Sequence, residues 1–208
     1  MTGGGEMPEG ATPLTPEEIA GLKHKHVTTR GQLDELEQGN IQEGLLWINR
    51  RRDRRKVLTE AFVRELHKRL FGEVWSWAGE FRATEKNIGV TPHQIAPQLQ
   101  DLLADVSYWT EHKTYSAVEI CARFHHRLVY IHPFANGNGR HARILADIVA
   151  AELLETKPID WAKGTDLQKL GSRRTEYIAA LRKADAKDYR SLLAFARDEP
   201  DSERKLKP

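Results

Sequence analysis

Two stretches in which apolar residues recur every three or four positions most constrain what this chain can fold into. A side chain every three or four residues falls on one face of an α-helix. The first stretch follows Ser116, which with Glu119 forms a capping box, and the second follows a glycine-bearing loop. They predict a largely buried helix, a short loop and a second buried helix. Their apolar members are Val118, Cys121, Phe124, Leu128 and Ile131, then Ile144, Leu145, Ile148, Val149 and Leu153.

Most of the remaining sequence also predicts helices. Capping residues open segments at Thr15, Thr29, Thr59 and Thr91, and weaker helical patterns cover 167–181 and 189–196. Only 80–90 has the pattern of an extended segment, since glycines bracket it, which predicts a small β-hairpin or flap. The fold class is therefore all-α with one small hairpin.

The composition narrows the function classes. The 208 residues suit one domain with an extension, and 32 Lys plus Arg against 30 Asp plus Glu leave a net charge of only +2. That balance does not favour nucleic-acid binding through the overall field. The chain has no long uncharged apolar run, which argues against a membrane span or a signal peptide. A single cysteine, Cys121, fits a reducing compartment, so we expect a cytoplasmic protein.

The loop between the two buried helices contains the groups that an anion-binding catalytic site needs. It spells HPFANGNGR over 132–140 and continues with His141, Ala142 and Arg143. Gly137 and Gly139 let backbone amides turn inward, at the positive end of the following helix. Arg140 and Arg143 supply forked donors that suit phosphate oxygens. This pattern predicts a phosphate site.

Five further loop residues have predicted roles. His132, at the end of the preceding helix, can accept a proton from a hydroxyl when its imidazole is neutral. Pro133 and Phe134 are expected to stiffen the loop and fill its inner side. Asn138 can hydrogen-bond a phosphate, and Asn136 can offer a carbonyl oxygen to a metal ion.

This segment resembles the signature of the Fic family, H-x-F-x-(D/E)-G-N-G-R-x-x-R. The resemblance runs from about Thr59 to about Leu154, and the WAGEFR and NIG sequences at 77–82 and 87–89 look like the family's flap. The layout is similar to the subgroup called mobile mystery protein B. The resemblance implies an all-helical core of about eight helices with a β-hairpin flap. It also implies a toxin-like, mobile genetic setting with a regulatory protein from an adjacent gene.

The resemblance divides the chain into five parts. They are a flexible segment 1–14, an N-terminal helical extension 15–58 with an inhibitory helix, a Fic core 59–154, C-terminal helices 155–199 and a flexible tail 200–208.

The activity that the resemblance implies is transfer of AMP from ATP, with Mg²⁺ or Mn²⁺, to a Ser, Thr or Tyr hydroxyl of a protein. His132 is then the general base, Phe134 the anchor of the loop, and Gly137 to Gly139 with Asn138 the binders of the α- and β-phosphates. Arg140 and Arg143 hold the β- and γ-phosphates, with Arg143 at the γ end. The flap would bind an extended target segment by strand addition. Its residues are Ala83, Thr84, Glu85, Lys86, Asn87 and Ile88.

Two departures from the family pattern matter. The metal-binding acid of the family is Asn136 here, and a neutral oxygen binds a hard cation more weakly. The inhibitory sequence (S/T)-x-x-x-E-(G/N) has no full match in the upstream helix. Glu37 and Glu43 are the two candidates, and Glu37 is favoured because it lies on the same side of its helix as Leu33 and Ile41. The expectation is a salt bridge from Glu37 to Arg143.

Several other interpretations remain beside this one. The fold can serve a phosphotransferase, or a catalytically weak nucleotide-binding regulator, as Asn136 suggests. The basic run 50–56 can bind nucleic acid, although a solvated helix end is favoured. Histidines 125, 126 and 132 can be read as metal ligands, but adjacent histidines diverge on a helix. We expect one of His125 and His126 to support the core or loop and the other to be solvated, and Cys121 to be buried and inert.

Overall fold

The computed structural model describes residues 12–51, 56–162, 167 and 171–197. Within these ranges the secondary structure is eight α-helices and one short 3-10 turn. The helices are α1 (Pro16–Ala20), α2 (Arg30–Arg50), α3 (Glu60–Phe71), α4 (Ile95–Glu111), α5 (Ala117–Ile131), α6 (Asn138–Glu152), α7 (Ser172–Asp185) and α8 (Arg190–Arg197), and the 3-10 turn η1 (Pro92–Gln94) precedes α4.

The predicted capping residues open four of these helices. The side chains of Thr15 and Thr29 accept hydrogen bonds in full capping boxes, and those of Thr59 and Ser116 accept from the amide three residues on. At Thr91 the expected helix begins as η1, and α4 starts only at Ile95. Capping residues therefore set the starts of four of the eight α-helices described.

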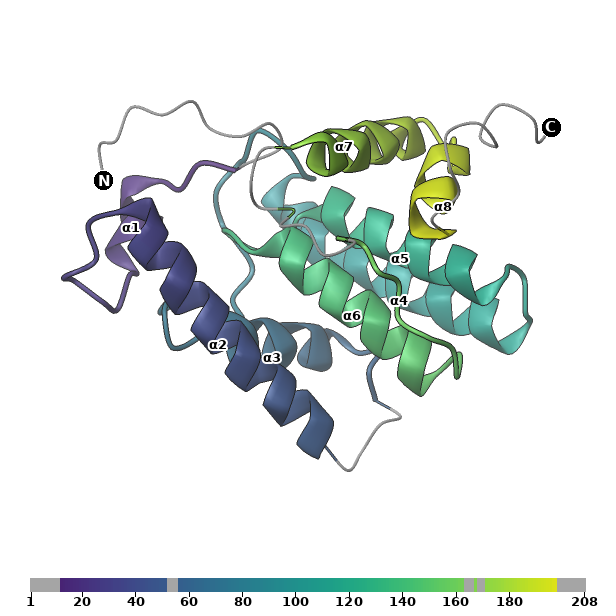
Figure 1. The fold of residues 1–208 in the computed structure, drawn as a ribbon, viewed down its shortest axis with the longest axis horizontal. Helices are drawn as coiled ribbons and strands as arrows, with labels where there is room; N and C mark the ends of the chain where they lie inside the picture. The colour runs from purple at the N-terminus through teal and green to yellow at the C-terminus, as the bar shows by residue number, and fades with distance from the viewer. Residues whose placement is uncertain (1–11, 52–55, 163–166, 168–170, 198–208) are drawn as a thin grey trace.

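The two helices predicted as buried form the centre of the molecule. α5 and α6 contact each other, α4 lies against α5, and α3 packs on α6 (Figure 1). Their apolar faces meet in the core, where Phe124, Leu128, Leu145 and Val149 are almost fully buried. Figure 1 shows α2 and α3 on one side of α6, and α7 with α8 on the other side of the bundle.

α2 is held against α3 by polar and small residues. Its buried residues are Glu37, Asn40 and Gly44, while its apolar residues are only partly buried. A side chain at Gly44 would meet the backbone oxygen of Arg69 at 2.9 Å. Asn40 donates from Nδ2 to that oxygen at 3.0 Å and accepts from the Glu73 amide at 2.9 Å. α2 therefore approaches α3 at van der Waals distance and places Glu37 inside the protein.

The segment 80–90 does not form the expected β-hairpin. The described residues include no strand, only an isolated antiparallel bridge between Leu22 and Trp75. Instead, the Arg82 amide donates to Pro133 O at 2.9 Å and the Val90 amide to Ile131 O at 3.4 Å. The backbone amides at the two ends of the segment therefore bond to the end of α5 and the start of the loop, and not to each other across a hairpin. Below, 82–90 is called the flap.

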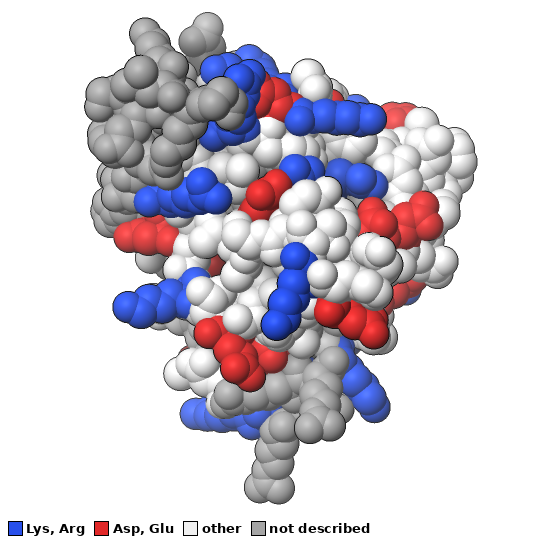
Figure 2. Space-filling model, turned by 90° about the vertical axis from the view of Figure 1, so that its right-hand side faces the viewer, with Lys and Arg blue, Asp and Glu red and all other residues white. Residues whose placement is uncertain are grey.

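Other expectations fall partly outside the described residues or differ from the structure. Segments 1–11 and 198–208 are not described, so neither is the flexible tail 200–208 nor most of the segment 1–14. The helix expected at 167–181 starts at Ser172. In the basic run, 52–55 are not described, Arg50 is exposed, and Arg51 lies 4.2 Å from the Phe62 ring centre. Figure 2 shows Lys and Arg interspersed with Asp and Glu over the face drawn.

The adjacent histidines of α5 are both buried, which corrects the expectation that one is solvated. His125 Nε2 lies 2.8 Å from the Tyr177 hydroxyl, and His126 contacts the Tyr189 hydroxyl and Asp185 at 3.1 and 2.9 Å. The C-terminal helices α7 and α8 cover this face of α5, which the sequence period could not reveal. Burial also raises the pKa of Cys121 to about 12. None of the helices described is long and apolar enough to cross a membrane.

Candidate active site

The loop begins with a strained residue, His132. It caps α5 in the left-handed region, at φ 55° and ψ 59°, where non-glycine residues are uncommon. Its carbonyl accepts from Arg82 Nε at 2.7 Å. A side chain at Gly89, itself at φ +100°, would meet the His132 Cβ at 2.5 Å, so this position requires glycine. The flap therefore packs directly on His132 and fixes its backbone.

The imidazole of His132 is held neutral with a defined tautomer. Burial, together with the charges of Arg82 and Lys86, lowers its pKa to about 4. Nδ1 lies 3.4 Å from the Val129 carbonyl oxygen, which can only accept, so Nδ1 carries the hydrogen. Nε2 is then an acceptor, and the Thr12 hydroxyl lies 3.0 Å from it. The structure places an acceptor nitrogen opposite a hydroxyl.

Three side chains fix the middle of the loop. Phe134 is fully buried, with its ring 3.7 Å from the ring of His67 between centroids. The Asn138 amide group accepts from the Phe134 amide at 2.9 Å and donates to its carbonyl at 2.8 Å. His67 Nε2 donates to Asn136 O at 3.0 Å, because its Nδ1 accepts from the Gly79 amide. The Asn138 side chain therefore holds the loop, and its expected phosphate contact would need this bonding to change.

The start of α6 offers unpaired backbone donors. Gly137, the N-cap residue, stands at φ 77° and has no side-chain oxygen to cap the helix. The first amide of this turn with a helical partner is that of His141, which donates to Gly137 O at 2.9 Å. The amides of Asn138, Gly139 and Arg140 precede it, as orphan donors do at any helix start. Together with the helix dipole they make a site suited to an anion.

A carboxylate lies beside this anion site. Glu37 Oε2 forms an ion pair with Arg140 Nη1 at 2.6 Å, and Glu37 Oε1 accepts from Trp75 Nε1 at 2.6 Å. The Glu37 side chain is 5% exposed, so water screens the pair little. The expected partner was Arg143, and the structure corrects it to Arg140. Glu43 is exposed on the other side of α2 and lies outside the site.

Arg143 contacts the C-terminal helices, and its Nη1 also lies beside the start of α6, 3.5 Å from where a Cβ on Gly139 would stand. Its guanidinium carbon lies 5.7 Å from the ring centre of Tyr177 in α7. Tyr177 in turn contacts His125 at 2.8 Å. Residues three apart are neighbours on a helix surface, yet Arg140 pairs with Glu37 of α2 whereas Arg143 lies against Tyr177 of α7.

The described residues do not form a cation site of their own. Asn136 Oδ1 accepts from the Gly137 amide at 2.5 Å and lies 3.4 Å from Arg140 Nη2. A neutral oxygen beside a guanidinium is a poor ligand for a hard cation. No group of three His, Cys, Asp or Glu side chains in the described ranges is arranged to hold a metal. A metal ion is therefore given no part in the catalytic steps described below.

The flap is closed by a residue that the sequence reasoning did not single out. Arg82 is buried, and it donates from Nη1 to Thr84 O at 2.8 Å and from Nη2 to Val90 O, besides its bond to His132 O. One guanidinium thus joins both ends of the flap to the loop. Of the expected flap residues, Thr84 and Lys86 contact Glu18 of α1. His67, Trp75 and Thr12 were also missed, since only tertiary contacts bring them to the loop.

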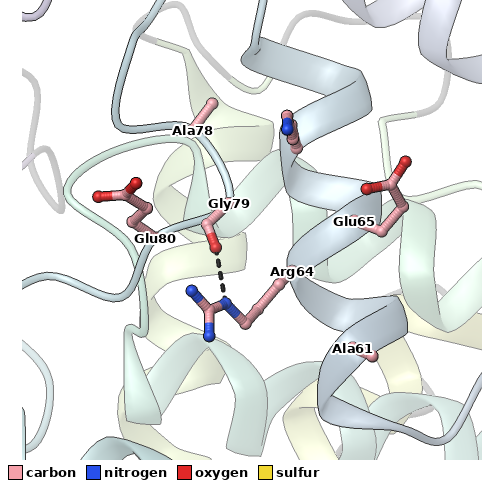
Figure 3. A pocket seen from close by; sticks show the side chains of 7 residues that line it. Ala61, Arg64, Glu65, Ala78, Gly79 and Glu80 are labelled. Atoms are coloured by element: carbon pink, nitrogen blue, oxygen red, sulfur yellow. Dashed lines mark hydrogen bonds between the residues drawn. The ribbon is translucent and has the colours of Figure 1, made fainter.

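A surface hollow lies away from this site, between α3 and the turn after Trp77. Figure 3 shows Arg64 crossing it, with its Nε donating to Gly79 O at 2.9 Å. Its lining includes no residue of the loop 132–143. The hollow is therefore separate from the candidate site. It is lined by Ala61, Arg64, Glu65, Lys68, Ala78, Gly79 and Glu80.

Solved structures define the fold class. The chain superposes on the N-terminal FIC domain of Bep8 from Bartonella sp. 1-1C with a TM-score of 0.69 and 15% identity, over 90% of this chain and 93% of that one. For Fic-1 (residues 134–508) from Caenorhabditis elegans the TM-score is 0.64 and the identity 23%, over 89% and 53% of the two chains. The fold is the all-helical Fic fold.

Sequence matches agree with this fold. Residues 57–150, which contain the whole loop 132–143 and most of α6, match the model of the Fic/DOC family. Protein adenylyltransferase fic-1 of Caenorhabditis briggsae is 36% identical over 93 residues, covering 42% of this chain and 18% of that protein. Protein adenylyltransferase Fic of Nematostella vectensis is 29% identical over 125 residues, covering 56% and 29%. This chain therefore spans less than a third of these relatives. The mobile mystery protein B subgroup stays a prediction.

Proposed function

We propose that this chain transfers AMP from ATP to a hydroxyl side chain of a protein. The observation that carries the proposal is the neutral His132, whose Nε2 accepts from a hydroxyl at 3.0 Å at the end of a loop that opens into an uncapped helix start. A pKa of about 4 leaves Nε2 unprotonated at neutral pH and free to accept a hydrogen bond, and it also makes the imidazole a weaker base than one whose pKa lies near 7. The names of the relatives, protein adenylyltransferases, support the same reaction.

In this proposal each group has a defined part. His132 removes the proton from the target hydroxyl as its oxygen attacks the α-phosphorus, and pyrophosphate leaves. The amides of Asn138, Gly139 and Arg140 stabilise negative charge on the phosphates from fixed positions, which costs little reorganisation. Arg140 and Arg143, which are neighbours in the first turns of α6, bind the outer phosphates. The flap binds the target segment through its backbone, by strand addition at 83–88.

We propose further that Glu37 is inhibitory. Its buried carboxylate pairs with Arg140, so an incoming phosphate must replace it. Trp75 holds the second carboxylate oxygen and keeps Glu37 oriented toward the loop. Displacement would break one charge-assisted contact with Arg140, of the kind worth about 1.5–3 kcal/mol.

We propose that Mg²⁺ or Mn²⁺ reaches this site mainly on the nucleotide phosphates, because the loop 132–140 offers it the neutral Asn136 oxygen in place of an acid. The change Asn136→Asp should then lower the metal concentration that gives half-maximal rate. An unchanged concentration would mean that the residue takes no part in binding the ion. We also propose a cytoplasmic location, in keeping with a single buried cysteine.

The proposed function is tested with ATP labelled on the α- or the γ-phosphate. The full chain is incubated with a cell lysate and Mg²⁺ or Mn²⁺, as wild type, His132→Ala and Glu37→Gly. Transfer of α-label that His132→Ala abolishes and Glu37→Gly increases supports adenylyl transfer. Transfer of γ-label would instead support a phosphotransferase. Nucleotide binding without transfer in any variant would favour a catalytically weak regulator, which the neutral Asn136 motivates.

A further inference from the structure

Residues 12–18, which lead into α1 and include its first turn, are bound along the flap. Lys86 Nζ donates to Pro13 O at 2.9 Å and pairs with Glu18, and Thr84 Oγ1 donates to Glu18 Oε1 at 2.8 Å. The side chains of Lys86 and Glu18 are only 2% and 11% exposed. An ion pair this sheltered is weakly screened, and it fixes the segment at a defined place on the flap.

Two further contacts define the direction of the segment. Trp77 Nε1 donates to Glu18 O at 2.9 Å, which holds the start of α1. Thr15 is extended, at φ −73° and ψ 162°, and its side chain caps α1. Burial opposes the ionisation of Glu18, but hydrogen bonds from Lys86, Thr15 and Thr84 still keep its pKa below the usual value. The chain that leaves α1 toward the N-terminus therefore runs along the flap to His132.

This binding brings the hydroxyl of Thr12 to the base. Thr12 Oγ1 lies 3.0 Å from His132 Nε2. Nε2 is the unprotonated nitrogen, so Thr12 is the donor in this hydrogen bond. A heavy-atom distance of about 2.6–3.2 Å is what proton abstraction by a general base requires. Thr12 therefore meets the base as an acceptor hydroxyl would.

We propose that Thr12 is an acceptor of this protein's own active site, which transfers AMP to it within one chain. The inference rests on the proposed function, because ATP is the AMP donor. Thr12 Oγ1 attacks the α-phosphorus of ATP while His132 Nε2 takes the hydroxyl proton. The bond from the α-phosphorus to the oxygen bridging to the β-phosphorus breaks, and pyrophosphate leaves. The product is a phosphodiester that joins the Thr12 oxygen to AMP.

The test is intact and peptide mass spectrometry of the full chain after incubation with ATP and Mg²⁺. It uses Glu37→Gly, in which the phosphate arginine is released, as the background. We expect one added AMP, located on Thr12. Thr12→Val, which keeps the shape but removes the hydroxyl, should lose it, and Thr12→Ser should retain it. Thr114→Val, at an exposed threonine after α4, is the matched control and should be modified like the parent.

The reaction within one chain is tested by mixing. A chain with His132→Ala and an intact Thr12 is incubated with an active chain that has Thr12→Val. If transfer is intramolecular, the His132→Ala chain stays unmodified, and the rate for the parent protein does not change with its concentration. Labelling of the His132→Ala chain at Thr12 would overturn the intramolecular step.

Release of pyrophosphate and labelling of lysate proteins separate the two levels of the proposal. If the Glu37→Gly protein labels other proteins but Thr12 stays unmodified, the inference about Thr12 fails while the proposed function stands. If it labels neither itself nor other proteins and releases no pyrophosphate, the proposed function fails and the inference fails with it. AMP on residues other than Thr12, undiminished in Thr12→Val, would likewise overturn the Thr12 assignment.

Discussion

The two ends of the loop 132–140 are both covered by the N-terminal part of the chain, but by opposite chemistry. At the first end a neutral hydroxyl, that of Thr12, meets the acceptor nitrogen of His132 at 3.0 Å. At the second end a carboxylate, that of Glu37, meets the guanidinium of Arg140 at 2.6 Å. A hydroxyl beside a base resembles a substrate, whereas an anion beside a phosphate arginine resembles a competitor. The same extension therefore can supply an acceptor and restrain the nucleotide.

The largest effect on AMP transfer is expected from mutating the two ends of the loop one at a time. His132→Ala removes the base, so we expect transfer of AMP to fall roughly a hundredfold to ten-thousandfold while ATP affinity changes little. Arg140→Ala, at the other end, should weaken ATP binding first. Rates and dissociation constants for both variants measure this. Equal loss of ATP affinity in the two variants would show that the ends do not have separate functions.

The comparison also depends on the buried residues beneath the loop, Phe134 and His67, which support both ends. Phe134 is fully buried against His67, so Phe134→Ala should lower the free energy of unfolding by about 3–5 kcal/mol. Urea unfolding gives this value, and Phe134→Leu, which keeps most of the volume, should cost less. A loss below about 1 kcal/mol for the alanine variant would mean that the loop is not anchored there.

Another buried residue beneath the loop, His141, should make the free energy of unfolding depend on pH. Burial lowers the pKa of His141, below the loop, to about 4 from its usual 6.5. As the pH is lowered, the unfolded chain binds a proton on this histidine at a higher pH than the folded protein does. The contribution of neutral His141 to the free energy of unfolding is therefore complete above about pH 6.5, and it falls by about 3 kcal/mol as the pH approaches 4. His141→Gln can still donate to Val63 O and should flatten this dependence.

Urea unfolding of the wild type and the glutamine variant between pH 7.5 and 4 measures the slope. Exposed His26 provides the control, because His26→Gln should leave the curve of the wild type unchanged. Identical slopes for wild type and His141→Gln would contradict the buried neutral imidazole.

Releasing the second end should raise activity more moderately. Glu37→Gly removes the carboxylate that pairs with Arg140, and we expect roughly a tenfold faster transfer. Glu37→Gln, which keeps an acceptor for Trp75 but has no charge, should be intermediate. Glu35→Gly places the same flexible residue at an exposed position of α2 and should have no effect on rate. Glu43→Gly should behave like this control, and activation by it would reverse the assignment.

Releasing the first end should give the smallest effect. Thr12→Val removes one neutral hydrogen bond, worth about 0.5–1.5 kcal/mol, and frees His132 for other hydroxyls. Transfer to a protein in a lysate should therefore rise a few-fold. The rate of labelling in the Thr12→Val and Glu37→Gly variants, separately and combined, compares the two ends directly. A multiplicative gain in the double variant is expected if the ends act independently.

Much of the fold was accessible from the sequence. The capping residues Thr15, Thr29, Thr59 and Ser116 open helices where predicted, because a cap acts within one turn of chain. The apolar period of α5 and α6 predicted their burial for a similarly local reason. The glycines, the histidine and the arginines of the loop marked the candidate site, since an anion site at a helix start is built from consecutive residues.

Only the tertiary structure decided how the site is completed. The flap forms no hairpin ladder, and its Arg82 side chain bonds both to the loop and within the flap. The C-terminal helices α7 and α8 bury both His125 and His126. Glu37 of α2 pairs with Arg140, whereas the neighbouring Arg143 lies against Tyr177 of α7. Thr12 meets His132 across 120 residues of sequence. Periodicity and capping are local properties, whereas these contacts depend on which helix faces are packed together, and no single segment encodes that choice.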